Sequence, residues 1–297
     1  MQSPVKVMLV SIFGFILLLS GGSTATAQFS VPDNLSIIGF DGESWNVYLS
    51  IDGTLEKLDP ISDPRSFSYS AQAGLVAFIG PDAHLYLHKL SEGKTTKLSN
   101  SNDNLRYAQP FFSTSGEQLY VVQLPEGKSR RTEIVSISMA DKQKRFLVRK
   151  RTAQFEPYAR DEKHLYYSTA ICVDDCEGMI WELWRREIAT AKQYQLTLLN
   201  HVSNQPHISA DNWLYFSSNA PDGHFHIWRM RPDVGASPEQ LTFEQTRDSE
   251  PFTDANNNLY FIRKTRQATK LMTLNEGVAT PVTTPVNLID FRNLEIR

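Results

Sequence analysis

Four amide or carboxylate side chains recur along this chain at similar intervals, and each stands directly before a proline. They are Gln109, Glu156, Gln205 and Glu250. Such side chains can exchange hydrogen bonds with a peptide segment or offer oxygen ligands to a hard divalent cation. The series also fits residues that cap turns and solvate a polar channel. Their recurrence predicts one ring of side chains, and therefore one candidate binding site.

The seven histidines are the second set of residues that could carry chemistry. His207 follows one of the recurring prolines, and it is the only histidine expected to point toward the same interior. His201 could approach it from the preceding connection. His224 and His226 would share one face of a strand, which permits joint metal ligation. No matching histidine recurs in the other repeats, so packing and solvent-exposed roles are favoured and no metal site is assigned.

Other functional classes leave no motif in the sequence. There is no Gly-x-Ser-x-Gly elbow, no phosphate-binding glycine loop and no His-Glu-x-x-His. The 30 basic residues do not exceed the 33 acidic ones, so nucleic acid is not an expected partner. The composition, 41% apolar and 21% charged, is that of a globular protein and not of a polytopic membrane protein.

The N-terminus has the pattern of a secretory signal peptide. Lys6 precedes an apolar run over residues 7–19, and Ala25-Thr26-Ala27 supplies the small residues that a signal peptidase accepts. Thirteen helical residues span only about 20 Å, too short for the ~30 Å hydrocarbon core. We therefore expect cleavage after Ala27, a short lead over residues 28–34, and a mature protein in the periplasm or outside the cell with no membrane span.

Two cysteines, Cys172 and Cys176, are the only ones in the chain. In an oxidising compartment such a pair is most simply a disulfide. A ring this small stabilises by about 2 kcal/mol, enough to hold one hairpin tip. Metal-binding and redox roles are the alternatives, but the chain has no second cysteine pair and no histidine within five residues to support them.

The elements that must position these residues are short strands in a repeat of about 45 residues. Leucine followed by an aromatic residue recurs at Leu119, Leu165, Leu214 and Leu259, at intervals of 46, 49 and 45 residues. A short later strand recurs six times, around Leu58, Leu98, Leu147, Leu196, Leu241 and Val282. Four-stranded units at this period predict an all-β, six-bladed β-propeller over residues 35–297.

The two ends of the chain predict how this ring closes. Three strand-like segments, residues 35–40, 45–49 and 55–58, lack a first partner, whereas residues 287–297 provide one strand and then stop. The N- and C-terminal strands are therefore expected to share the sixth blade, which leaves no free sheet edge.

Residues 206–219, with Ile227-Trp228 and Leu241-Thr242 downstream, resemble the TolB-type propeller repeat. The resemblance extends over residues 35–297 and is weakest near Arg65, where the proline is missing. TolB carries a separate α/β domain before its propeller, and residues 28–34 leave no room for one after the predicted cleavage site. The resemblance implies a binding scaffold, but not TolB's own role.

The sequence thus predicts an exported, monomeric, non-catalytic propeller without a cofactor. Its partner would be an envelope or secreted protein or peptide, bound at a channel mouth by Gln109, Glu156, Gln205, His207 and Glu250. The alternative is a metal-dependent lyase or hydrolase whose site uses His207 and the channel carboxylates, and a channel-bound divalent cation is left open.

Overall fold

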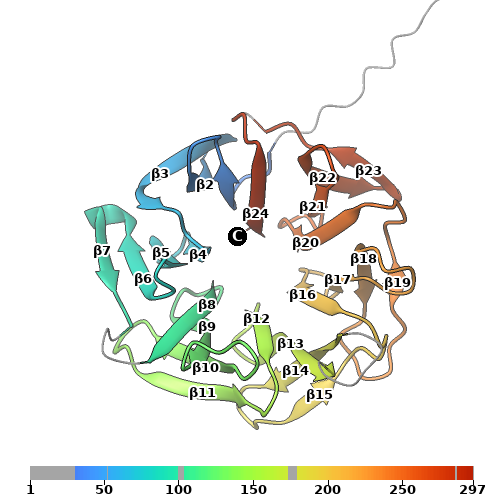
Figure 1. Ribbon diagram of the computed structural model, residues 1–297, viewed down its shortest axis with the longest axis horizontal. Helices are drawn as coiled ribbons and strands as arrows, with labels where there is room; N and C mark the ends of the chain where they lie inside the picture. Colours follow the sequence, from blue (N-terminus) through green and yellow to red (C-terminus); the bar gives the residue numbers. More distant parts are fainter. Residues whose placement is uncertain (1–30, 52, 100–103, 173–178, 285, 297) are drawn as a thin grey trace, which may run out of the picture.

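The computed structural model describes residues 31–51, 53–99, 104–172, 179–284 and 286–296. These residues form six four-stranded sheets that stand as blades around a central channel (Figure 1). All neighbouring strands within a blade are antiparallel. The predicted six-bladed β-propeller is confirmed. The predicted signal peptide, residues 1–27, lies outside the described residues.

The blades follow one another around the ring in chain order. Blade 1 is β4 (Ser66–Ser70), β5 (Leu75–Ile79), β6 (Leu85–Lys89) and β7 (Lys94–Lys97). Blade 2 is β8 (Leu105–Phe112), β9 (Gln118–Pro125), β10 (Glu133–Ser138) and β11 (Lys144–Arg149). Blade 3 is β12 (Gln154–Tyr158), β13 (His164–Cys172), β14 (Ile180–Glu187) and β15 (Gln193–Gln195).

The remaining blades complete the circle. Blade 4 is β16 (Ser203–Ile208), β17 (Leu214–Ser218), β18 (His226–Met230) and β19 (Glu239–Gln240). Blade 5 is β20 (Arg247–Thr253), β21 (Leu259–Lys264), β22 (Thr269–Asn275) and β23 (Val278–Pro281). Blade 6 is β24 (Asp290–Ile296), β1 (Leu35–Phe40), β2 (Trp45–Ile51) and β3 (Thr54–Ser62), so both chain ends contribute to it.

Blade 6 closes the ring as the sequence predicts. The C-terminal strand β24 is its innermost strand and pairs with β1, with Leu35 opposite Ile296 and Phe40 opposite Asp290. In Figure 1 the red β24 lies beside the blue strands, with the C-terminus at the channel. The innermost strands of the other blades are β4, β8, β12, β16 and β20.

The leucine–aromatic repeats form the second strand of their blades, where both faces of the sheet are covered by neighbouring blades. Leu119, Tyr120 and Val121 are consecutive residues of β9, and each is at most 2% exposed. Burial of successive residues is typical of strands that are covered on both sides. Stacking of the blades therefore explains why these strands are continuously apolar.

Helix is almost absent from the described residues. They contain one short 3₁₀ turn, Leu90–Glu92. Within the described part of the chain, no helix is long and apolar enough to cross a membrane.

Candidate functional site

Each proline of the recurring series marks a bulge in an innermost strand. The register between the first and second strand of the blade shifts where Gln109, Glu156, Gln205 and Glu250 stand. These four residues have φ values of +48° to +58°, in the left-handed region. That conformation costs a non-glycine residue roughly 1–2 kcal/mol. The bulge turns each side chain out of the ladder and toward the next blade.

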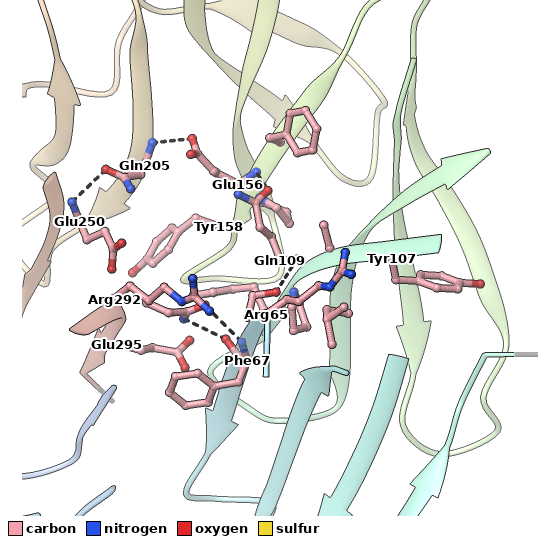
Figure 2. A pocket seen from close by; sticks show the side chains of 18 of the residues that line it. Arg65, Phe67, Tyr107, Gln109, Glu156, Tyr158, Gln205, Glu250, Arg292 and Glu295 are labelled. Carbon is pink, nitrogen blue, oxygen red and sulfur yellow. Dashed lines mark hydrogen bonds between the residues drawn. The ribbon is translucent and has the colours of Figure 1, made fainter. Parts of the chain in front are cut away.

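The side chains turned outward in this way bind the backbone of the following blade. The N–H of Glu156 donates to Oε1 of Gln109 (2.9 Å). The N–H of Gln205 donates to Oε2 of Glu156 (2.7 Å), and that of Glu250 donates to Oε1 of Gln205 (2.9 Å). Figure 2 shows this relay from blade to blade. The recurring residues therefore link the blades to one another.

Two blades without the proline complete the circle. Glu250 Oε2 accepts the N–H of Leu294 (2.7 Å), and Asn293 Oδ1 accepts the N–H of Phe67 (3.2 Å). The N–H of Gln109 donates to Oγ of Ser66 (3.0 Å). The six residues that accept these hydrogen bonds form what we call the clasp ring: Ser66, Gln109, Glu156, Gln205, Glu250 and Asn293.

Two members of the clasp ring are partly buried carboxylates. Burial raises the pKa of Glu250 to about 7, and the neighbouring negative charge of Glu156 adds to this, while the backbone N–H groups and Arg247 oppose it. Burial also raises the pKa of Glu156, against the hydrogen bonds from Gln205 N–H and Ser168 Oγ. At neutral pH the Glu250 carboxyl is therefore only partly ionised, because burial disfavours its charged form.

A second layer of side chains, two residues further along each innermost strand, closes the channel below the clasp ring. The aromatic layer consists of Phe111, Tyr158, His207 and Phe252. The Tyr158 ring centroid lies 4.7 Å from that of Phe111 and 4.9 Å from that of His207, and His207 lies 4.3 Å from Phe252. The layer is completed by Glu295, whose carboxylate accepts hydrogen bonds from Ser68 Oγ and Tyr69 N–H, both 2.9 Å.

We expect Tyr158→Phe to destabilise the protein by about 1 kcal/mol. The Tyr158 hydroxyl donates to the carbonyl oxygen of Ile208 in the next blade (3.1 Å), and the variant leaves this buried acceptor without that donor. Urea denaturation measures the loss. Tyr69→Phe, at a partly buried tyrosine of blade 1, is the matched control and should have a smaller effect. Equal effects of the two substitutions would contradict a role for this bond.

The aromatic layer divides the channel into two cavities. The larger, of about 770 Å³, lies at the starts of the innermost strands and includes all six clasp-ring residues in its lining. We call it the mouth pocket. The smaller, of about 420 Å³, lies at the opposite ends of the strands, and we call it the lower cavity. Phe111, Tyr158 and Phe252 line both, so the mouth pocket is a cup with an aromatic floor.

The predicted site residues fall into two groups. Gln109, Glu156, Gln205 and Glu250 meet at the mouth pocket, as the repeat predicts. His207 does not join them, because it lies in the aromatic layer and lines the lower cavity. Its Nε2 accepts the N–H of Thr253 (3.0 Å). The His207 side chain therefore packs between blades 4 and 5, and its Nε2 lone pair is occupied by this hydrogen bond.

The remaining candidate residues are two further histidines, considered for metal binding, and the cysteine pair, considered for a disulfide. His226 is buried, with Nε2 3.2 Å from the Asp222 carboxylate, and His201 Nδ1 lies 2.8 Å from the carbonyl oxygen of Leu199. Among the described residues, no group of three or more His, Cys, Asp or Glu side chains is placed to hold a metal ion. Cys176 lies outside the described residues, so its disulfide with Cys172 stays a prediction.

Comparison with solved structures places this geometry among known propellers. A structure assigned to TolB of Agrobacterium tumefaciens superposes with a TM-score of 0.63 at 15% identity, covering 84% of this chain and 89% of that one. TolB from Acinetobacter baumannii gives 0.66 at 13% identity, with 89% and 67% covered. This chain is a six-bladed β-propeller and shares that fold with the TolB structures.

The propeller also matches parts of larger enzymes. A puromycin-hydrolysing peptidase from Mycobacterium tuberculosis superposes with a TM-score of 0.61 at 16% identity. This chain covers 46% of that peptidase, so it corresponds to less than half of it. No model of a known protein family matches the sequence, and neither does any curated protein. The structural likenesses, all at low identity, show the fold.

The proline repeat does not identify the residues at the mouth of the channel that lack a neighbouring proline. Ser66 and Asn293 complete the clasp ring, but neither precedes a proline. The mouth pocket is also lined by Arg65, Arg106 and Arg292, which the sequence did not single out (Figure 2 labels the first and last). Alignment of the six innermost strands by register places Ser66 and Asn293 with the other clasp-ring residues, and Arg65 and Arg292 one residue before them, but it does not identify Arg106.

Proposed function

We propose that this protein is an exported, non-catalytic binding scaffold whose mouth pocket receives a segment of a protein or peptide. The observation that carries the proposal is the pocket itself. Its volume of about 770 Å³ is within the usual range for binding sites, and its floor is aromatic while its rim is polar and charged. The clasp ring links the six blades around the pocket, so the binding site is already formed in the absence of a ligand.

The face around the mouth pocket supports a macromolecular partner. Leu198 and Phe243 are 76% and 71% exposed, at equivalent positions in the connections that lead into β16 and β20. Ile289, 60% exposed, directly precedes β24. All three precede the starts of innermost strands, where the mouth pocket opens. Exposed large apolar side chains around a pocket are typical of interaction surfaces.

The likeness to TolB structures supports the scaffold reading, and the likeness to peptidase propellers keeps an enzyme as the alternative. The geometry favours binding, because the site's amides and carboxylates each hold a backbone N–H of the next blade. Side chains that are occupied by such hydrogen bonds are suited to maintaining the shape of the mouth pocket. Export is part of the same proposal and rests on the pattern of residues 1–27.

The proposal predicts that the purified chain selects peptides from a random 12-residue library and that they bind at the mouth pocket. Ala108→Trp places a large side chain in this pocket, and we expect it to weaken the selected peptides at least 10-fold by calorimetry. Ala210→Trp, in the lining of the lower cavity, is the matched control and should leave affinity unchanged. Thermal melts verify that both variants are folded.

Three results would contradict this proposal. Selection of no peptide would remove the binding function. Loss of affinity in Ala210→Trp alone would place the ligand at the other end of the channel. Cleavage of the selected peptides, seen by mass spectrometry after prolonged incubation, would replace the scaffold with an enzyme.

A further inference from the structure

Three arginines stand on one side of the mouth pocket, in consecutive blades. Arg292 belongs to β24 of blade 6, Arg65 precedes β4 of blade 1, and Arg106 belongs to β8 of blade 2. Arg65 and Arg292 occupy the same position, one residue before a member of the clasp ring. We call these three residues the arginine arc.

Each guanidinium of the arginine arc is anchored by a backbone carbonyl. Arg65 Nη2 donates to the oxygen of Pro81 (2.6 Å), and Arg292 Nη2 donates to that of Pro64 (3.3 Å). Arg106 Nη1 donates to the oxygen of Leu105 (3.0 Å). The Arg292 guanidinium also lies over the Trp45 ring, 4.3 Å from its centroid. The arc is therefore pre-oriented, and each guanidinium keeps further N–H donors for a ligand.

The arginine arc has no carboxylate partner in the described part of the chain, where no ion pair involves Arg65, Arg106 or Arg292. Arg263, by contrast, does form an ion pair: its guanidinium lies 2.7 Å from the buried carboxylate of Asp248. Positive charge that is clustered on one wall of a cavity and forms no ion pair there favours an anionic ligand at that wall. Guanidinium groups are suited to a carboxylate, because their fork matches its two oxygens.

The rest of the pocket restricts where that anion can lie. Glu156 lies in blade 3, away from the arc, but Glu250 holds the N–H of Leu294 in β24. Asp82 and Glu295, which belong to the arc's own blades 1 and 6, also line the pocket. These carboxyl groups disfavour a second negative charge next to them, so an anion must lie on the guanidinium groups themselves. Figure 2 shows Arg65 and Arg292 on one side and Glu156 on the other. An anionic group is therefore directed to the arc.

The aromatic floor decides how a chain can enter. Phe111, Tyr158 and Phe252 close the cup, so a polypeptide cannot pass through into the lower cavity. A chain terminus can enter end-on and place its last side chain on the aromatic rings. Of the two termini, only the C-terminus brings the charge that the arginine arc attracts.

We propose that the mouth pocket recognises the free C-terminus of a peptide or protein partner, with its carboxylate on Arg65, Arg106 and Arg292 and its last side chain on the aromatic floor. This inference rests on the proposed binding function and names the chemistry of the ligand. The carboxylate replaces water on the guanidinium groups, and no covalent step is involved.

The experiment compares two pools of N-acetylated random tetrapeptides that differ only at their end. One pool has free C-terminal carboxylates, and the other is amidated. Each is passed over the immobilised full protein, and retained peptides are identified by mass spectrometry. We expect at least 10-fold greater retention of the free-acid pool. Raising NaCl from 50 to 500 mM should reduce this preference, because salt screens exposed charges.

Substitutions then locate the carboxylate. Arg65→Gln, Arg106→Gln and Arg292→Gln should each weaken the best free-acid peptide 3-fold or more, and the triple variant should abolish the preference for free acids. Arg160→Gln, in the lining of the lower cavity, is the matched control and should bind normally. Thermal melts exclude unfolding as the cause. Unchanged preference in the triple variant would overturn the inference.

Further outcomes separate this inference from the function on which it rests. Equal retention of both pools, with Ala108→Trp still blocking them, would refute the C-terminal carboxylate and leave peptide binding intact. Equal retention of an amidated peptide with an internal aspartate would assign the arc to acidic side chains, and would also refute it. Retention of no peptide from either pool would overturn both proposals.

Discussion

Deletion of residues 290–297 is expected to abolish cooperative unfolding, the largest effect that we predict for this protein. The deletion removes β24, the innermost strand of blade 6. Phe291, Leu294 and Ile296 of this strand are buried against the neighbouring blade. Each such side chain contributes roughly 1.5–3 kcal/mol, and a domain's net stability is only about 5–15 kcal/mol.

The same deletion also removes hydrogen bonds that join three blades. Glu250 of blade 5 loses the N–H of Leu294, and blade 1 loses the carboxylate of Glu295, which accepts bonds from Ser68 and Tyr69. Beyond the lost bonds, the backbone edge of β1 is left exposed. Circular dichroism melts and urea titrations should therefore show a broad, non-cooperative change, or an aggregated protein.

A circular permutant is the control for this deletion. Fusing residues 290–297 ahead of residue 31 keeps every strand, because Ile296 already lies opposite Leu35 in the β24–β1 pair. We expect its melting temperature within a few degrees of the wild type. A monomeric deletion variant with an unaltered melting temperature would refute closure by the C-terminal strand.

Glu250→Gln is expected to stabilise the protein at pH 8 by about 3 kcal/mol and to leave it unchanged near pH 4. The pKa of Glu250 is raised from its ordinary value of 4.5 to about 7, with burial as the main cause. A carboxyl with a raised pKa contributes most to stability when both states are protonated, below pH 4.5. Between pH 4.5 and 7 the carboxyl ionises in the unfolded chain but stays largely protonated in the folded protein, so its contribution to stability falls. Above pH 7 this contribution is lost.

The amide can replace the carboxylate because the clasp ring already uses amides elsewhere. Gln109 and Gln205 accept the same backbone hydrogen bond through Oε1 (2.9 Å each). Glu250→Gln therefore keeps the acceptor for Leu294 N–H and removes the poorly solvated charge. Glu250→Ala removes both and should destabilise by about 1–3 kcal/mol at acidic pH, where no charge is present to remove.

Urea titrations at pH 4, 6 and 8 measure these differences. Glu43→Gln, at an exposed residue before β2, is the control and should show no comparable pH-dependent gain. A stability gain of Glu250→Gln that is the same at pH 4, 6 and 8 would contradict the raised pKa of Glu250. If the gain is found, the wild type keeps a carboxylate where an amide is more stable, as expected for a site selected for binding.

Much of the fold was predictable because it depends on local and periodic features. The leucine–aromatic pair recurs in the second strand of blades 2 to 5, because neighbouring blades cover both faces of that strand. Strands β1, β2 and β3 were placed correctly as a blade without its inner strand. The site was predictable only in part. The prolines located Gln109, Glu156, Gln205 and Glu250, because each proline marks a bulge in an innermost strand.

The residues that the sequence did not single out are those whose roles depend on contacts between blades. Ser66 and Asn293 belong to the clasp ring without any proline beside them, since serine and asparagine oxygens accept the same backbone N–H. His207 was expected at the mouth, but its ring packs between Tyr158 and Phe252. Residue spacing does not show which layer of the channel a side chain occupies.

The sequence by itself determined the repeat, the number of blades and the way in which the two ends meet, because strand period and turn chemistry are encoded within each unit of about 45 residues. Only the tertiary structure decided that the recurring amides and carboxylates bind the next blade, that aromatic rings close the channel, and that three arginines share one wall. The physical reason is that these properties arise between residues some 45 or more positions apart, which become neighbours only when the ring has closed.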